Sequence, residues 1–282
     1  MKALGLIAKA QHLKAPSPTV VQLLTLLAKP EADNEDIIRL IDQDAVMSAK
    51  LLGMSNAAVY GLSSPCTSID QAVLYLGHSE IHRLAMNAGF GAQLHPDLKG
   101  YAIGESELWQ HSQATALVCV MLAERSPELE FETAIAYTGG LIHDIGKAVI
   151  SRSLTPEIRA QMMALIEKKS LTLIAAERAV LGTNHAEVGA ELLRIWRLPA
   201  VLIEAVAHHH DPVVKPHLKL SALVHVADLI ALEGGRSPGI GSYALTASED
   251  AINALNLKPE DLENLVLQTS DKLAVSGRVP SH

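Results

Sequence analysis

Apolar residues recur along most of this 282-residue chain at the three- and four-residue spacing of a helical face. Hydrophobic residues make up 49% of the chain and aromatic residues only 3%, so the apolar mass is mainly Ala, Leu, Ile and Val. A chain of this length and composition can bury a substantial core. We therefore predict an all-α fold, a bundle of many helices.

Capping residues, prolines and glycines set the expected helix ends. Asn34 and Asp44 are the expected N-caps of two short helices, and Gly77 is expected to stop another helix in the left-handed conformation. Helices are expected from Pro18 to near Pro30, from Ser68 to Leu76, from Ser79 onward, and over 105–124, 131–143, 156–168, 172–181, 185–196, 199–208, 218–232, 248–255 and 259–273.

The composition changes at residues 94–101, which read Leu-His-Pro-Asp-Leu-Lys-Gly-Tyr. We predict a boundary there between an N-terminal helical subdomain, residues 1–100, and a metal-binding helical domain, residues 101–235. Residues 236–282 are expected to form short C-terminal helices after the glycine-rich break at 234–241.

Charge and composition exclude several classes of protein. The net charge is −8 and no basic stripe is interleaved with aromatic residues, so no nucleic-acid partner is expected. The apolar stretch at residues 1–11 is too short for a membrane span and lacks a cleavage signature. Cys66 and Cys119 are isolated, which fits a reducing compartment. We expect a cytoplasmic protein without membrane contact.

The sequence also offers imidazole and carboxylate groups without any thiolate, a set that suggests a metal site. His143 and Asp144 directly follow a run of small and apolar residues, 138–142, and are expected at the end of a helix. A carboxylate can bridge two cations while the adjacent imidazole binds the first. Asp228 lies on an otherwise hydrophobic helix, where an unpaired charge would cost several kcal/mol. The other candidates are His111, His185, His208, His209 and His210.

Each candidate also has a structural interpretation. A single histidine such as His111 on a half-apolar helix is commonly satisfied by ordinary hydrogen bonds. The His-Asp dipeptide recurs at 210–211, so it carries little information by itself. His225 either supports the site or is a structural residue. The run 208–210 favours ligation, because three neutral imidazoles are poor core material, although a surface patch is the alternative.

The order of these residues, with His-Asp-Ile-Gly-Lys at 143–147, resembles the HD superfamily of metal-dependent phosphohydrolases and especially its HD-GYP branch. The N-terminal half is similar to the HDOD domain, an HD-related regulatory module. That similarity spans roughly residues 8 to 232 and rests on the segments 13–19, 41–45, 49–52, 55–61, 69–72 and 76–77.

The resemblance implies an HD-type bundle with two divalent metal ions. The first ion would be held by His111, His143, Asp144 and Asp228, with Asp144 shared, and the second completed by His185, His209 and His210; His208 ranks below these two. Asp144 would then be catalytic, and Lys147 would hold a phosphate oxygen. Many HDOD members lack much of this set, so its presence favours metal binding here.

Residues 211–217 lack the Asp-Gly-x-Gly-Tyr-Pro segment of the HD-GYP branch, so cleavage of cyclic dinucleotides is not expected. Ligands of this kind suit Fe, Mn, Ni, Zn or Mg. Two such ions would suit hydrolysis of a nucleotide or another small phosphate ester. The alternative is a non-catalytic signalling scaffold with a structural or vestigial metal site. In either case we expect a signalling protein as partner, which the sequence does not identify.

Overall fold

Helices form the whole framework of the described chain. The structure, a computed structural model, describes residues 3–9, 13–27, 33–126, 133–212, 219–236, 239–241 and 248–276. Within these ranges the nearest approach to a sheet is one isolated antiparallel bridge between Leu98 and Ile103, so the all-α prediction is confirmed. The helices are α1 (Ala3–Lys9), α2 (Pro18–Leu27), α3 (Asn34–Asp42), α4 (Ala45–Ser55), η1 (Ala58–Tyr60), α5 (Ile69–Leu76), α6 (His78–Leu94), η2 (Lys99–Tyr101), α7 (Glu107–Arg125), α8 (Thr133–Ile142), α9 (Ile145–Ile150), η4 (Ser151–Ser153), α10 (Pro156–Lys169), α11 (Leu173–Leu181), α12 (His185–Ile195), α13 (Ala200–His208), α14 (Lys219–Glu233), α15 (Glu249–Ala254) and α16 (Pro259–Ser276).

The observed helix caps test the helix ends that were predicted at Asn34, Asp44 and Gly77. Asp44 caps α4 by accepting hydrogen bonds from the backbone N–H groups of Val46 and Met47. The Asn34 prediction was wrong: Asp33 is the cap and Asn34 is the first helical residue. Gly77 has the expected positive φ of 79°, but its ψ of 163° is extended, so the chain passes directly from α5 into α6 instead of closing a left-handed cap.

Two helices were not anticipated. Residues 3–9 were treated only as an apolar stretch, yet they form α1, which packs on α9 and α12. Residues 145–147 were not assigned to any helix, yet they begin α9, in which every residue is buried. A helix buried on all sides shows no amphipathic period, so its sequence gives no periodic signal. The helix ends predicted at Pro30 and at residues 131 and 218 lie outside the described residues.

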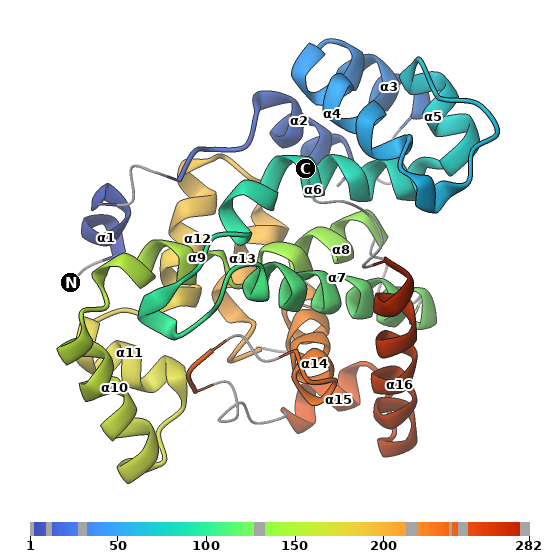
Figure 1. Ribbon diagram of the computed structural model, residues 1–282. Coiled ribbons are helices and arrows are strands. Elements are labelled where there is room, and N and C mark those ends of the chain that lie inside the picture. Colours follow the sequence, from blue (N-terminus) through green and yellow to red (C-terminus); the bar gives the residue numbers. More distant parts are fainter. Residues whose placement is uncertain are drawn as a thin grey trace.

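The N-terminal helices α2 to α5 form a group that α6 connects to the rest of the molecule (Figure 1). α6 packs against α4 and α5 on one side and against α7, α8 and α9 on the other. Its buried residues include Leu84, Met86 and Phe90. α6 therefore links the N-terminal helices to the central ones within one continuous apolar core.

The central helices surround α8 and α9. α7 packs along α8 and α14, α9 packs against α12, and α13 lies between α12 and α14. α10 and α11 form a pair at the edge of the molecule, and α16 packs on α7 and α14 (Figure 1). Cys66 and Cys119 are both buried and unpaired. Among the described helices, none has both the length and the apolar character that a membrane crossing requires.

Candidate metal centre

Glycines allow the helices that carry the site to approach closely. A Cβ at Gly140 would lie 2.7 Å from the Cα of Ala116 in α7, and one at Gly146 would lie 1.9 Å from the carbonyl oxygen of His185 in α12. Only glycine fits at such distances, because a methyl group would overlap neighbouring backbone. These two contacts bring α7 and α12 against the junction of α8 and α9, where His143 and Asp144 lie.

The first group of converging side chains is His111 from α7, His143 and Asp228 from α14. The Nε2 atom of His111 lies 3.2 Å from Nε2 of His143 and 3.1 Å from Oδ1 of Asp228. His143 Nε2 lies 3.8 Å from the same carboxylate oxygen. All three side chains are buried. Three residues far apart in the sequence thus present their polar atoms to one small volume.

The second group consists of Asp144, His185, His209 and His210. His185 Nε2 lies 3.2 Å from Oδ1 of Asp144 and 2.9 Å from Nε2 of His210. His209 Nε2 lies 3.8 Å from Asp144 Oδ1. The other oxygen of Asp144, Oδ2, lies 3.4 Å from Nε2 of His143. The Asp144 carboxylate therefore faces both groups, one oxygen toward each.

Hydrogen bonds on the far side of the rings set the protonation of four histidines. The Nδ1 atoms of His111, His143 and His209 lie 2.7, 2.8 and 2.7 Å from the backbone carbonyl oxygens of Arg236, Gly140 and Val206. The fourth, Nδ1 of His185, lies 2.8 Å from Oε2 of Glu177. A carbonyl or carboxylate oxygen only accepts, so each Nδ1 carries the proton and the neutral ring has its lone pair on Nε2.

In this arrangement the Nε2 atoms of neutral rings and the carboxylate oxygens, all hydrogen-bond acceptors, face one another. When the rings are neutral, the contacts of His111 with His143 and with Asp228, and that of His185 with Asp144, each join two electron-rich atoms. Such contacts are repulsive unless a proton or a cation lies between the atoms. The buried atoms Asp144 Oδ1 and His209 Nε2 also have no hydrogen-bond partner among the described residues. The residues therefore fit a site for divalent cations, in which Nδ1 is held from behind and Nε2 is a ligand.

The two carboxylates stay ionised despite their burial. Burial raises the pKa of Asp144, but Lys147 and His143 outweigh it and hold that pKa well below its ordinary value. Burial likewise raises the pKa of Asp228, while the hydrogen bond from His111 and the charge of His143 lower it to about 2. Both side chains therefore provide anionic oxygens.

The imidazoles divide into two kinds. Burial alone lowers the pKa of His185, but Glu177 and Asp144 outweigh it and raise the pKa to about 9. For His209 and His210 burial is also the largest effect, and neighbouring imidazoles add to it, so both pKa values lie well below the ordinary value. In this pair the neutral ring needed for metal ligation is strongly favoured.

The structure also gives the positions of three other residues that the sequence singled out, Lys147, His208 and His225. Lys147 is buried and its Nζ lies 2.6 Å from Asp144 Oδ2. His208 points away from the cluster and lies 3.5 Å from Glu204, with 38% of its side chain exposed. His225 is buried outside the two groups, and its Nδ1 lies 2.7 Å from the carbonyl oxygen of His209. It supports the backbone that carries a candidate ligand.

Sequence reasoning did not identify Glu177 in α11 or Tyr101 in η2. Glu177 is fully buried and accepts hydrogen bonds from the backbone N–H of His185 and from the Tyr101 hydroxyl, the latter at 2.6 Å. One available signal was spacing: Glu177 lies four residues from both Leu173 and Leu181, on the buried face of its helix. Tyr101 had no comparable signal, because it lies in a short 3-10 turn.

Known proteins resemble this chain in sequence and in structure. The family model for the HDOD domain matches residues 13–212. Ribonuclease Y from Deinococcus radiodurans is 32% identical over 136 residues, which are 48% of this chain and 18% of that protein. The matched regions cover 36%, 18% and 29% of three curated relatives, so the chain spans only a minor part of their length.

Two solved structures share the fold over nearly the whole chain. An HDOD domain protein of unknown function from Geobacter sulfurreducens has a TM-score of 0.69 at 24% identity, covering 99% of this chain and 95% of the other. A protein from Marinobacter aquaeolei VT8, provisionally named for signal transduction, has a TM-score of 0.74 at 20% identity, covering 98% and 65%. Together with the match of the family model to most of its length, the fold shows that the chain belongs to the HDOD family.

Proposed function

We propose that this HDOD protein holds two divalent cations and hydrolyses a nucleotide or another small phosphate ester as part of a regulatory role. One observation carries the proposal: buried Nε2 atoms and carboxylate oxygens face one another while Nδ1 atoms are held from behind, so neutral rings present acceptors to acceptors. A purely structural histidine cluster would alternate donors with acceptors. The arrangement in this chain is what a cation site requires.

Each residue has a role in the proposed centre. His111, His143 and Asp228 would hold the first ion, His185, His209 and His210 would hold the second, and Asp144 would serve both. When bound, the ions supply an acidified water and positive charge for the phosphoryl oxygens. Lys147 orients the Asp144 carboxylate and, once an ion takes over that charge, is free to hold a phosphate oxygen.

The substrate class follows from charge and from relatives. Ribonuclease Y is named for action on RNA, which makes a phosphodiester a reasonable class of substrate to test. The net charge of −8 opposes binding of a long polyanion. We therefore place small phosphate esters and nucleotides ahead of RNA.

The test combines metal content with turnover. Protein stripped by a chelator is reloaded with Mn, Fe, Ni, Zn or Mg, analysed for bound metal, and assayed on nucleotides, sugar phosphates and a short RNA. We expect about two ions per chain and hydrolysis of a small ester. Asp144→Asn should abolish both, whereas Asp70→Asn, the same change on the exposed face of α5, should leave both intact.

A second candidate function is favoured by the burial of the cluster. Six of the seven candidate ligands are less than 5% exposed, and none of the seven lines the large cavity discussed below. A non-catalytic scaffold with a structural metal would have this property. Two tightly bound ions without turnover on any of the esters would select the scaffold, while absence of metal from the reloaded protein would contradict both.

A further inference from the structure

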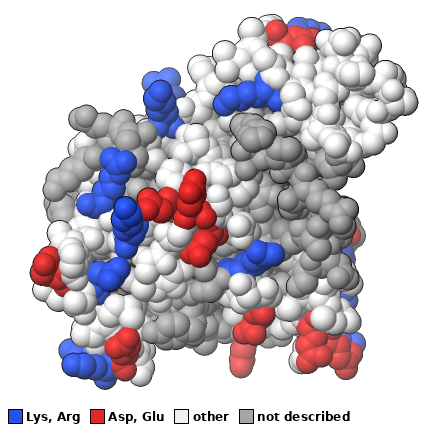
Figure 2. Space-filling view, in the orientation of Figure 1, with Lys and Arg blue, Asp and Glu red and all other residues white. Residues whose placement is uncertain are grey.

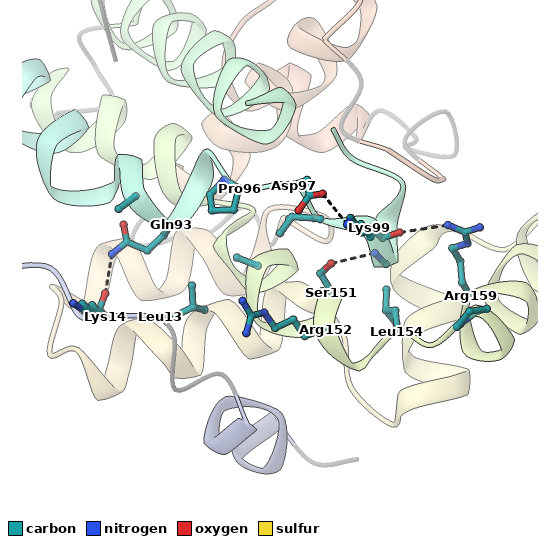
Figure 3. Close-up of a pocket in the computed structure, with 15 residues that line it drawn as sticks. Leu13, Lys14, Gln93, Pro96, Asp97, Lys99, Ser151, Arg152, Leu154 and Arg159 are labelled. Carbon is teal, nitrogen blue, oxygen red and sulfur yellow. Dashed lines mark hydrogen bonds and ion pairs between the residues drawn. The ribbon is translucent and has the colours of Figure 1, made fainter. Parts of the chain in front are cut away.

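A cavity of about 870 Å³ lies outside the candidate metal centre. Its wall is formed by the segment before α2, the end of α6, η2, and the run from α9 through η4 into α10. Figure 3 shows Lys14 and Gln93 at one end, Lys99 and Arg159 at the other, and Arg152 between them. The volume is that of a site for a small organic ligand.

The charged residues of the wall are mainly basic. Lys14, Lys99, Arg152 and Arg159 line the cavity, and the acidic residue in its wall is Asp97. The chain as a whole has 23 basic and 31 acidic residues, so this wall departs from the overall balance. Figure 2 shows several Lys and Arg side chains, with acidic ones among them, on the side where α9 and α10 lie in Figure 1.

The basic side chains of the wall make few ion pairs or hydrogen bonds with other residues of the described chain. Arg152 makes no ion pair or side-chain hydrogen bond with the described part of the chain. Arg159 donates one hydrogen bond, 3.4 Å long, to the backbone carbonyl of Lys99, which leaves its other donors available. Lys99 lies 3.6 Å from Asp97 with 88% of its side chain exposed, a weak surface pair. Guanidinium groups with spare donors are suited to phosphate oxygens.

Leucine side chains form much of the remaining wall, and a hydrogen bond fixes the segment before α2 to α6. Leu13, Leu98 and Leu154 contribute apolar surface, suited to the organic part of a ligand. Gln93 donates a 2.7 Å hydrogen bond to the carbonyl of Lys14, which fixes the first segment to α6. The cavity therefore combines an apolar floor with a basic rim.

We propose that this cavity binds a phosphate ester of a small organic group, such as a nucleotide or a sugar phosphate, at a site separate from the metal centre. An acidic peptide is a poorer occupant, because its extended chain would need backbone partners along a groove. The ester pairs its phosphate with basic side chains of the rim and places its organic part against the leucines.

The walls of the cavity continue into the metal centre. η2 contributes Lys99 and its last residue, Tyr101, donates a hydrogen bond to Glu177, which in turn holds His185. On the other wall, Ser151 accepts a hydrogen bond from the backbone N–H of Gly100 and follows α9 directly. The cavity therefore borders two elements that also support the metal centre.

Calorimetric titration tests the proposal in the presence of a chelator, so that the outcome is independent of metal binding and of hydrolysis. The probes are ATP, GMP and glucose 6-phosphate, each compared with adenosine, guanosine or glucose. We expect at least one phosphate ester to bind saturably at one site and its uncharged counterpart not to bind. Arg152→Gln with Arg159→Gln should weaken that binding about tenfold or more.

A matched control is Lys168→Gln, which removes an exposed positive charge from the same helix as Arg159 but outside the cavity. It should leave the affinity unchanged. The proposal is overturned if none of the three esters binds, if the double variant binds as well as wild type, or if Lys168→Gln weakens binding equally.

Discussion

The N-terminal helices and the central helices bury different chemistry. Within α2 to α5, Ser55 is the one buried polar side chain among the described residues, and the interior consists of residues such as Leu23, Ile41 and Leu51. The helices from α7 to α14 bury histidines, carboxylates and a lysine in one place. The first region is stabilised by apolar burial, whereas the second includes ionisable groups whose burial is unfavourable until they are neutralised.

The difference implies two kinds of stability. Mutations in α2 to α5 should change the free energy of unfolding equally with and without metal. Mutations among the central helices should change stability and metal affinity together, because a cation that binds only the folded state stabilises it. The predictions below test this separation.

The largest effect is expected for Gly146→Ala. The new Cβ would overlap the backbone carbonyl of His185, so α9 and α12 must separate. We expect a loss of about 3 kcal/mol or more in the free energy of unfolding, measured by urea denaturation, together with loss of metal affinity. Gly53→Ala is the matched control, because nothing lies within 4 Å of a Cβ built at this position in the last turn of α4. It should stabilise the protein by about 0.5–1 kcal/mol. Equal effects at the two glycines would refute the comparison.

Metal removal should have the next largest effect. With metal at about 100 times its dissociation constant, wild type should gain about 2.7 kcal/mol per bound ion relative to the chelator-treated protein, seen as a shift in Tm. Asp228→Asn should lose most of this gain, since it removes one of the two charged ligands. Leu51→Ala in α4 should be less stable than wild type but keep the full metal-dependent shift. A reduced shift in that variant would show that the two regions are not separate.

Glu177→Gln should have a smaller effect. The change preserves shape but removes the charge that holds Nδ1 of His185. We expect metal affinity to fall about 10- to 100-fold in a competition assay with a chelating dye. Glu187→Gln, at an exposed carboxylate paired with Arg178, provides the control and should bind metal as wild type does. An unchanged affinity for Glu177→Gln would mean that His185 is not a ligand.

The smallest effect is expected for the cap of α4. Asp44→Ala should destabilise the protein by about 1 kcal/mol at neutral pH, regardless of metal. The hydrogen bond from the backbone of Met47 is the largest influence that lowers the pKa of Asp44. The contribution of a carboxylate with a lowered pKa is complete above its ordinary value and disappears as the pH falls through the folded-state value. Urea denaturation of both proteins at pH 7 and pH 3 should show the difference shrinking in acid.

The sequence by itself determined the helical class, most helix positions and the list of candidate ligands. Helical class and helix positions depend on spacing within one segment, as at Asp44 or Pro156, and local physics sets such features. The residue types of the site, histidines and acids at unusual positions, were also visible without coordinates.

Only the tertiary structure decided which of those residues meet. His111 and Asp228 come from helices more than a hundred residues apart, and their approach depends on the close packing that Gly140 and Gly146 permit. The separation of His208 from its neighbours, and the support of His185 by Glu177, are also consequences of packing. A sequence states what each residue can bind, but distances between distant segments are set by how helices fill space together.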